Sequence, residues 1–250
     1  MAYLRDTAIV LKNEPFREHD ARVTLYGRTH GKLSAVARAG RRAGAKALGH
    51  LEPFSEVEVM IAIGDAFDKL AVARMTKPRL NLREQLAPLM IFGPLLHAID
   101  VSTQPGVADE TIYFLLEEAL DVGDRLPEEP SSARGRLLRA AVSFKLLHAL
   151  GYGPRVDRCG FCESSCDQQA WWQADQAQVV CASCVQSNRI PVYGRHELSA
   201  LALRLLRVLR ERPLKEVLSI TAPVIIFETA SAFVEACVQQ TPVLGERGKV

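Results

Sequence analysis

The first 75 residues alternate between apolar and polar positions, as expected for β-strands that bury one face. Turn signals such as His30-Gly31 and Gly64-Asp65 separate the alternating stretches. Strands are predicted at residues 7–11, 21–26, 32–37, 56–61 and 68–73. Five short strands joined in this way fit a small closed barrel, and the OB-fold is the five-stranded example. We therefore predict an OB-fold barrel in residues 1–78.

From about Pro78 the apolar positions recur with the 3.6-residue period of a helix. Helices are predicted at residues 86–102, 109–123, 131–150, 197–211 and 222–240. Gly151 ends the third of these helices, because glycine readily adopts the backbone conformation that terminates a helix. The pattern predicts a helical domain in residues 79–250, into which a cysteine-rich segment is inserted at about 157–187. The predicted fold class is α+β.

Four cysteines in this segment have the spacing of a metal site. Cys159-x-x-Cys162 is followed, after 18 residues, by Cys181-x-x-Cys184. Each Cys-x-x-Cys places two thiolates on one side of a tight turn, and four thiolates complete a tetrahedral zinc shell. With no position left for water, one structural zinc per chain is predicted, in a zinc-ribbon-like segment that it helps to fold. Four free buried cysteines, or a redox role for one pair, are the alternatives.

Other residues of this region have simpler interpretations. Cys166 lies close to the first pair and is expected to be a bystander, and Cys237 is expected in a helical core. Trp171 and Trp172 lie between the two pairs and could stack on bases. We favour the alternative that they cover a ribbon too small to have another core.

The charges are distributed unevenly, although the formal net charge is only +2. Residues 1–51 contain ten lysines and arginines against four acidic residues, and no acidic residue occurs between Asp20 and Glu52. A basic block at one end of a chain indicates a polyanionic partner.

The centre of this block lies between two predicted barrel strands. Its four cations, separated mostly by alanine and glycine, are Arg38, Arg41, Arg42 and Lys46. A solvated surface loop is the alternative, but the charge density, the lack of acids and the position on a barrel favour nucleic-acid binding. Arg17, Arg22 and Lys32 are further candidates for phosphate contacts.

A second basic pattern occurs in the predicted helix 197–211. Arg204, Arg207 and Arg210 recur every three residues and so share a face beside several leucines. A solvated face is the simpler interpretation. The alternative is a basic rim around an apolar groove that accepts an acidic peptide.

The sequence lacks the motifs of nucleotide binding and of common catalytic sites. No histidine has the spacing of a metal ligand, and the acidic residues fall on predicted helix faces or strand exteriors. We therefore expect a protein that is not an enzyme and binds no nucleotide. The apolar stretch 86–99 is interrupted by two prolines and is too short for a membrane span, and no signal peptide is recognisable. A cytoplasmic protein without a membrane partner is expected.

Three stretches of the chain resemble the RecO family of bacterial DNA repair proteins. They are residues 5–11 with 16–20, residues 31–42, and residues 150–162, where a helix end, a Gly-Tyr-x-Pro turn and the first Cys-x-x-Cys follow one another. The resemblance implies an N-terminal OB-fold, a helical domain and a zinc-bearing insertion with the four named cysteines as ligands. It also implies binding of single- and double-stranded DNA, annealing of complementary strands, and action with RecR and SSB in loading RecA.

The same resemblance implies docking of the acidic, apolar C-terminal tail of SSB, which requires a cation beside an apolar slot. The basic face of helix 197–211 is one candidate, with Leu201 and Leu205. Arg136 and Arg139 beside Leu137 and Leu138 are the other. An RNA-binding or transcription-associated factor with the same barrel and zinc ribbon remains the alternative function.

Overall fold

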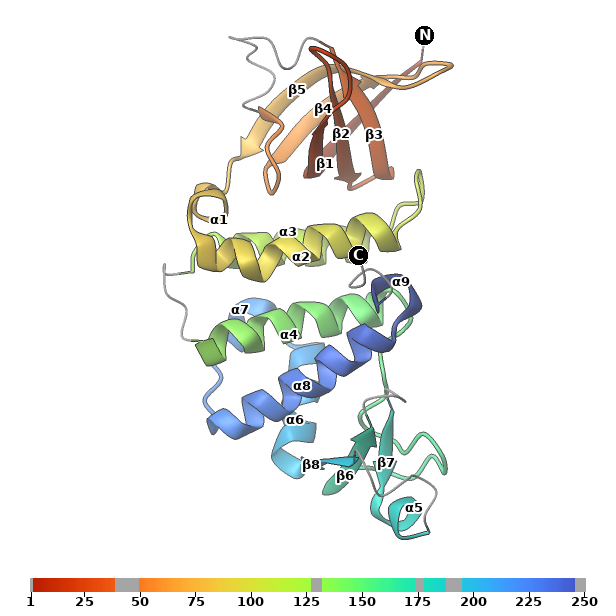
Figure 1. The fold of residues 1–250 in the computed structure, drawn as a ribbon, viewed down its shortest axis with the longest axis vertical. Coiled ribbons are helices and arrows are strands. Elements are labelled where there is room, and N and C mark those ends of the chain that lie inside the picture. Colours follow the sequence, from red (N-terminus) through yellow and green to blue (C-terminus); the bar gives the residue numbers. More distant parts are fainter. Residues whose placement is uncertain (1, 39–49, 127–131, 174–177, 188–194, 246–250) are drawn as a thin grey trace. The chain divides into compact units, whose positions relative to one another are not determined.

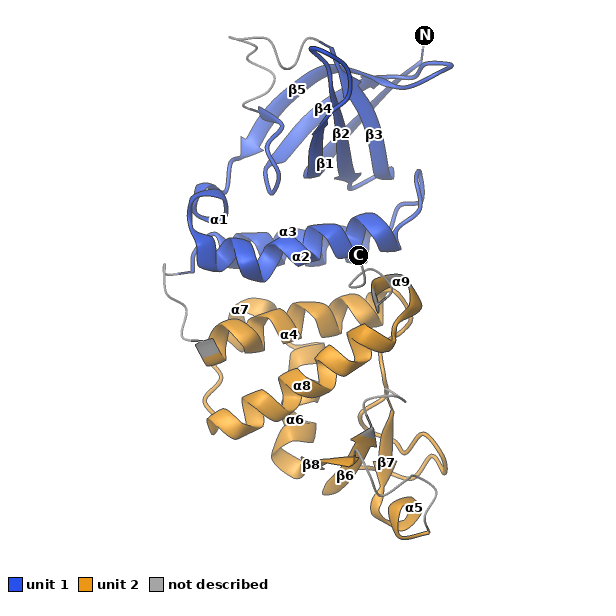
Figure 2. Ribbon diagram, in the orientation of Figure 1, with its two compact units in different colours: residues 1–128 blue, residues 129–250 orange. Residues whose placement is uncertain are grey.

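The computed structural model describes residues 2–38, 50–126, 132–173, 178–187 and 195–245 (Figure 1). The chain divides into two compact units, residues 1–128 and 129–250 (Figure 2). The predicted domain boundary near residue 78 falls inside the first unit, where strands give way to helices, and stays a prediction. None of the described helices is long and apolar enough to cross a membrane.

The first unit begins with a closed barrel of five strands. They are β1 (Tyr3–Pro15), β2 (Ala21–Gly27), β3 (Gly31–Ala37), β4 (Glu56–Ala62) and β5 (Lys69–Lys77), arranged in the order β1-β2-β3-β5-β4. β1 pairs with both β2 and β4, and a register shift between Val10 and Lys12 marks a bulge where this long strand bends. The barrel and the helices that follow confirm the predicted OB-fold and the α+β class.

The interior of the barrel is filled by the apolar positions of the alternating pattern. Val23 and Leu25 of β2 and Val57 and Ile61 of β4 are buried, together with Leu51 from the segment before β4. Burial of an aliphatic side chain of this size stabilises the fold by about 1.5–3 kcal/mol. The polar residues between them remain on the outside, where they are available for function.

Three helices complete this unit at the end of the barrel where β5 finishes (Figure 1). They are α1 (Leu80–Glu84), α2 (Leu86–Ser102) and α3 (Glu110–Gly123). Polar contacts join the barrel to α3. Buried Arg79 donates to the carbonyl oxygen of Phe54 at 2.8 Å and pairs with Asp121 of α3 at 2.7 Å. The hydroxyl of Tyr26 donates to the carbonyl oxygen of Asp109, the N-cap of α3, at 3.4 Å.

The second unit combines helices with a small sheet. Its helices are α4 (Ser132–Ala149), α5 (Ala182–Gln186), α6 (Ala200–Glu211), α7 (Leu214–Val217), α8 (Val224–Gln240) and α9 (Pro242–Gly245). The strands β6 (Gln169–Gln173), β7 (Val179–Cys181) and β8 (Arg195–Ser199) form an antiparallel sheet in the order β7-β6-β8. The cysteine-rich segment is therefore followed by this sheet, whose last strand, β8, continues directly into α6.

The helix predicted at 197–211 begins three residues later than expected. Residues 195–199 form β8 instead, because they pair with β6 along its length. Ser199 is the N-cap of α6, and its hydroxyl accepts a hydrogen bond from the backbone N–H of Ala202 at 3.3 Å. The pairing partner of β8 is about 25 residues away in the sequence, which a local periodicity does not reveal.

Candidate nucleic-acid interface and metal centre

Two loops bring a pair of aromatic rings together at one end of the barrel. Phe16 lies in the loop between β1 and β2, and Phe67 lies in the loop between β4 and β5. Their ring centroids are 5.9 Å apart in an edge-to-face arrangement. In OB-folds these two loops flank the surface that binds oligonucleotides. The strand directions place them at the end of the barrel away from α2 and α3 (Figure 1).

Three cations surround the two rings. The guanidinium of Arg17 lies 5.2 Å from the centroid of each ring, and that of Arg22 lies 4.3 Å from Phe16. The ammonium group of Lys69 lies 5.9 Å from the Phe67 centroid. We call these five residues the Phe16–Phe67 cluster. Cation–π contact orients the guanidinium groups, while aromatic surface for bases and positive charge for phosphates lie side by side.

The sequence predicted only part of this cluster. Arg17 and Arg22 were candidates, whereas Phe16, Phe67 and Lys69 were not assigned to the site. Phe16 and Phe67 are separated by 50 residues, and only the topology of the barrel brings them together. An aromatic residue in each of the two ligand-flanking loops is the signal that could have identified them.

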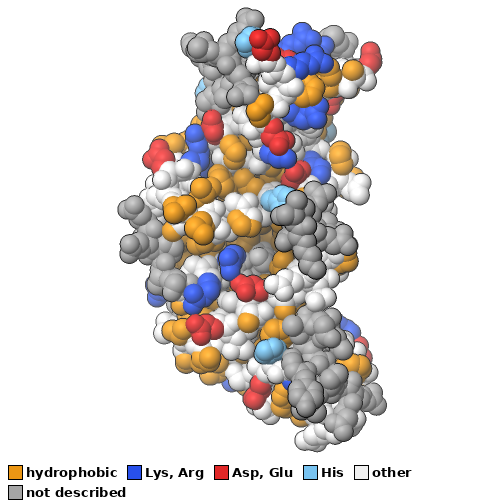
Figure 3. Space-filling model, viewed as in Figure 1, with side chains coloured by type: hydrophobic (Ala, Val, Ile, Leu, Met, Phe, Trp, Pro, Cys, Tyr) orange, Lys and Arg blue, Asp and Glu red, His pale blue; other side chains and the backbone are white. Residues whose placement is uncertain are grey.

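Arg38 follows β3 at the same end of the barrel and is exposed. There β3 approaches β5: the backbone N–H of Val36 donates to the carbonyl oxygen of Asp68 at 2.8 Å, and Val36 pairs with Lys69. Arg38 thus extends the basic surface of the cluster. Figure 3 shows lysine and arginine side chains on one face of the barrel. The other predicted contacts, Arg41, Arg42 and Lys46, lie outside the described residues, and their role stays a prediction.

Lys32 has a different environment from the other barrel candidates. Its ammonium group donates to the carbonyl oxygen of Asp100 in α2 at 2.6 Å and lies 3.7 Å from the carboxylate of that residue. Only 16% of the Lys32 side chain is exposed. The charge is therefore engaged in fixing α2 to the barrel, and we leave Lys32 out of the proposed interface.

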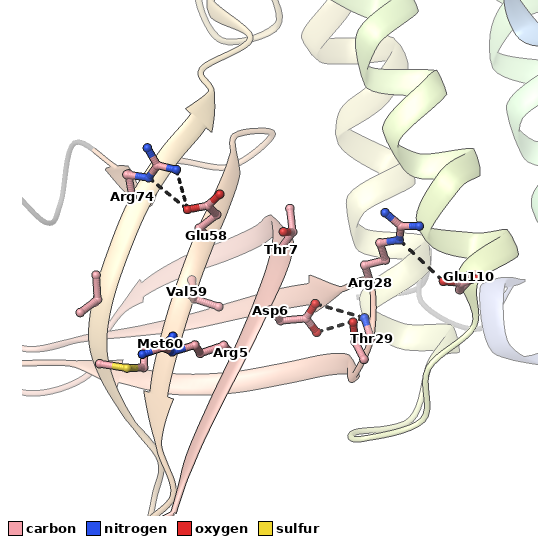
Figure 4. Close-up of a pocket in the computed structure, with 11 residues that line it drawn as sticks. Arg5, Asp6, Thr7, Arg28, Thr29, Glu58, Val59, Met60, Arg74 and Glu110 are labelled. Atoms are coloured by element: carbon pink, nitrogen blue, oxygen red, sulfur yellow. Dashed lines mark hydrogen bonds and ion pairs between the residues drawn. The ribbon is translucent and has the colours of Figure 1, made fainter.

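A separate cleft of about 830 Å³ lies on the barrel wall nearer the helices (Figure 4). It is lined by Arg5, Asp6, Thr7, Arg28, Thr29, Glu58, Val59, Met60, Val72, Arg74 and Glu110. Arg74 pairs with Glu58 at 2.7 Å, and Arg28 lies 3.6 Å from Glu110. Because carboxylates alternate with guanidinium groups there, a phosphate backbone gains less than at the Phe16–Phe67 cluster, where the cations face aromatic rings.

The four predicted metal ligands meet in the second unit. The ligand atoms of Cys159, Cys162, Cys181 and Cys184 all lie within 4.8 Å of one another. The first pair lies in a hairpin, where the backbone N–H of Cys159 donates to the carbonyl oxygen of Ser164 at 2.8 Å. Cys181 ends β7, and Cys184 lies in the helix α5 that follows immediately.

The proton affinities of these thiols fit a site for a soft divalent cation. Hydrogen bonds from the hydroxyl and backbone N–H of Ser164 lower the pKa of Cys162 to about 6. Burial, followed by contacts with the neighbouring cysteines, raises the pKa of Cys184 to about 12. A divalent cation would displace the proton that the Cys184 thiol retains. The four-cysteine group is compatible with a structural metal.

The other cysteines and the two tryptophans of this region are buried or half-buried. Cys166 is buried, and burial raises the pKa of its thiol to about 12. Trp172 is also buried, stacking on His196 with centroids 4.7 Å apart and meeting Phe233 of α8 edge to face at 5.4 Å. Trp172 thus joins the small sheet to the helices, while Trp171 is half-buried. Cys237 lies in the buried face of α8.

The arginines considered for peptide docking have partners within the second unit. Arg207 pairs with Asp167 at 2.8 Å, and Arg210 lies 3.9 Å from Asp157. Arg204 is exposed and donates to the carbonyl oxygen of Ala200, in its own helix, at 3.4 Å.

Two leucines were predicted to supply apolar surface beside these arginines. Leu201 is exposed and can do so, whereas Leu205 is buried. On α4, Arg136 pairs with Glu228 at 3.3 Å and Arg139 with Glu235 at 2.6 Å, both on α8. Docking of the SSB tail at these residues stays a prediction.

A five-stranded barrel with aromatic and cationic loops, followed by a helical part whose four-cysteine group is compatible with a structural metal, defines the class of OB-fold proteins with a helical second part. Profiles of two families match the chain: "Recombination protein O N terminal" at residues 1–79 and "Recombination protein O C terminal" at residues 87–242. The chain therefore belongs to the recombination protein O (RecO) family of DNA repair proteins, as its resemblance predicted.

Three relatives, each named DNA repair protein RecO, illustrate the similarity. The protein of Thermoanaerobacter sp. (strain X514) is 24% identical over 82% of this chain and 79% of its own length. That of Pelotomaculum thermopropionicum is 26% identical over 87% of this chain and 80% of its own length. That of Geobacter sulfurreducens is 28% identical over 81% and 79% respectively. Similarity along most of both chains supports a role in DNA repair and recombination.

Proposed function

We propose that this chain is a recombination mediator that binds single-stranded DNA at the Phe16–Phe67 cluster. The observation that carries the proposal is the meeting of two aromatic rings and three cations on the loops that flank the OB-fold ligand surface. Bases stack on the rings, and phosphates contact Arg17, Arg22 and Lys69. Such binding tolerates different sequences, because every base offers an aromatic face.

The wider activity is proposed from family membership. The chain binds single- and double-stranded DNA, anneals complementary strands and, with RecR, helps to load RecA onto single-stranded DNA coated by SSB. Binding and positioning of strands account for this work, so the protein acts without being an enzyme and without a nucleotide. Its place of action is the cytoplasm, at the nucleoid.

The metal at the four cysteines is proposed to be a single zinc ion. Four thiolates are a common donor set for structural zinc, and they leave no coordination position open for water or substrate. The metal therefore stabilises the segment between α4 and β8 and takes no part in chemistry. Its bond to all four cysteines ties the hairpin of Cys159 and Cys162 to the end of β7.

Fluorescence anisotropy with labelled single-stranded DNA tests the binding site. The variant Phe16→Ala with Phe67→Ala is expected to bind at least about ten-fold more weakly, because loss of stacking costs about 1–3 kcal/mol per base. Arg74→Ala is the matched control, since this exposed arginine lies on the barrel but pairs with Glu58 in the separate cleft.

Equal affinity of the double variant and the wild type would place DNA binding elsewhere. The same titration with RNA of identical sequence separates the proposal from an RNA-binding function. Tighter binding of RNA than of DNA would favour that alternative.

A further inference from the structure

Two arginines on α6 point toward the hairpin that carries the first pair of cysteines. The backbone N–H of Cys166 donates to the carbonyl oxygen of Asp157 at 3.0 Å, which closes the base of this hairpin. Two carboxylates lie at this base: that of Asp157, whose backbone accepts the hydrogen bond, and that of Asp167, which follows Cys166 in the sequence. Arg207 and Arg210 share a face of α6, because they are three residues apart, and each pairs with one of these carboxylates.

Arg207 makes the closer contact with the hairpin. One of its terminal nitrogens donates to the carboxylate of Asp167 at 2.8 Å and to the carbonyl oxygen of Cys166 at 3.3 Å. Only 24% of its side chain is exposed, and its Nε is buried without a hydrogen-bond partner among the described residues. The bond to Asp167 is charge-assisted and stronger than one between neutral groups. Because 58% of the Asp167 side chain is exposed, solvent screens part of this interaction.

The second arginine connects the hairpin to the helical core. One terminal nitrogen of Arg210 lies 3.9 Å from Asp157, the other donates to the carboxylate of Glu211 in the same helix at 2.8 Å, and 28% of the side chain is exposed. Its carbonyl oxygen accepts a hydrogen bond from the ammonium group of Lys145 in α4 at 2.9 Å. Leu203 and Leu206 each lie four residues before one of the two arginines, on the same side of α6, and both are buried. The arginines therefore link a small hairpin, which has little core of its own, to a packed helix.

We propose that Arg207 and Arg210 are positioning residues for the metal centre, and that they set how firmly this chain retains its zinc. The proposal rests on the four-cysteine zinc site proposed above. Metal affinity depends on how well the ligands are held before the ion binds, and loss of a group that hydrogen-bonds to a ligand typically weakens it by about 10–100-fold. The two arginines act one step further out, through the residues at the base of the ligand hairpin, so an effect near the lower end of this range is expected. Without the arginines, the hairpin of Cys159 and Cys162 keeps the hydrogen bond from the backbone N–H of Gly160 to the carbonyl oxygen of Val179 in β7 at 2.9 Å, but it loses its polar contacts with α6 and moves more relative to Cys181 and Cys184.

The rate of zinc release from the full-length protein to the chromogenic chelator 4-(2-pyridylazo)resorcinol tests this proposal. Arg207→Ala is expected to release zinc about ten-fold faster than the wild type, and Arg210→Ala less than that because its pair is longer. Arg204→Ala is the matched control, since Arg204 lies on the same helix and, among the described residues, donates to the carbonyl oxygen of Ala200 in that helix and makes no ion pair with the hairpin. It is expected to release zinc at the rate of the wild type.

A charge exchange separates positioning from a general loss of stability. Arg207→Asp and Asp167→Arg should each accelerate release, and the two together should restore the rate in part, because an aspartate at position 207 regains the ion pair but cannot donate to the carbonyl oxygen of Cys166. Should Arg207→Ala fail to fold, Arg207→Lys retains the charge and loses the fork of donors, and an intermediate rate is expected. Unchanged release from Arg207→Ala, equal acceleration by Arg204→Ala, or no restoration by the exchange would overturn the proposal.

Zinc analysis of the wild type distinguishes a failure of the proposed zinc site from a failure of the proposed positioning role. A wild type that contains no zinc contradicts the metal site itself and the inference with it. A wild type with one zinc per chain, whose release is insensitive to the arginines, contradicts only the positioning role.

Discussion

At the scale of single residues, similar side chains on the barrel have different roles that depend on distant neighbours. Arg22 and Lys32 both lie on predicted strands in the basic block, and the sequence treats them alike. Arg22 faces the ring of Phe16, whereas Lys32 meets Asp100, which is 68 residues away. The charge pattern was thus sufficient to indicate a basic surface, but the partner of each cation depends on how the chain returns to the barrel.

The contrast between these two residues gives a prediction. Lys32→Ala should lower the free energy of unfolding by about 1.5–3 kcal/mol, because a hydrogen bond to a charged group is lost and Asp100 is left unpaired. Its affinity for single-stranded DNA should remain unchanged. Arg22→Ala should weaken the binding of single-stranded DNA and leave the free energy of unfolding nearly unchanged. Urea denaturation and DNA anisotropy on both variants check this, and a Lys32 variant that is stable but binds DNA poorly would contradict it.

At the scale of elements, periodicity predicted the strands of the barrel and most of the helices. The alternating burial of β2 and β4 follows directly from the sequence pattern. The small sheet of the second unit was not predicted, because Trp171 and Trp172 in β6 were considered as a base-stacking pair or as a cover for the zinc ribbon, and not as strand residues. Residues 197–199 were predicted as the first turn of a helix, but they belong to β8, which pairs with β6.

The cysteine spacing, by contrast, correctly predicted that these four cysteines come together. The two Cys-x-x-Cys motifs are local, and each brings its own thiols together, so only the meeting of the two pairs required the fold. The role of Arg207 and Arg210 could not be predicted, because Asp157 and Asp167 lie 40 or more residues before them. A basic helix face looks the same in the sequence whether it meets solvent or another part of the chain.

Substitution of single cysteines tests the ligand set. Cys159→Ser should lose the zinc and destabilise the second unit, since it removes one of the four thiolates. Cys166→Ser should keep one zinc per chain, because its buried thiol lies outside the four-cysteine group. Elemental analysis and thermal unfolding check both expectations. Equal loss of metal from the two variants would show that the ligand set is wrong.

At the scale of the whole molecule, the charge asymmetry of the sequence agrees with the proposed division of roles. The basic block belongs to the barrel, and the metal centre belongs to the helical unit. The sequence resemblance and the family profiles agree along most of the chain.

The salt dependence of binding measures how much the basic block contributes to the whole interface. Arg41→Ala with Arg42→Ala should weaken binding to a similar extent for different DNA sequences. The log–log slope of affinity against salt should become shallower by roughly one to two units, since fewer counterions are released. An unchanged slope in this double variant would remove Arg41 and Arg42 from the phosphate contacts.

The most direct test of the central claim is the annealing of complementary single strands coated by SSB, with no nucleotide added. The wild type is expected to accelerate annealing, because it needs only to bind and present the strands. Phe16→Ala with Phe67→Ala should abolish most of this acceleration, while Arg74→Ala should retain it. Annealing by the double variant at the rate of the wild type, or a requirement for nucleotide, would contradict a mediator that acts through the Phe16–Phe67 cluster.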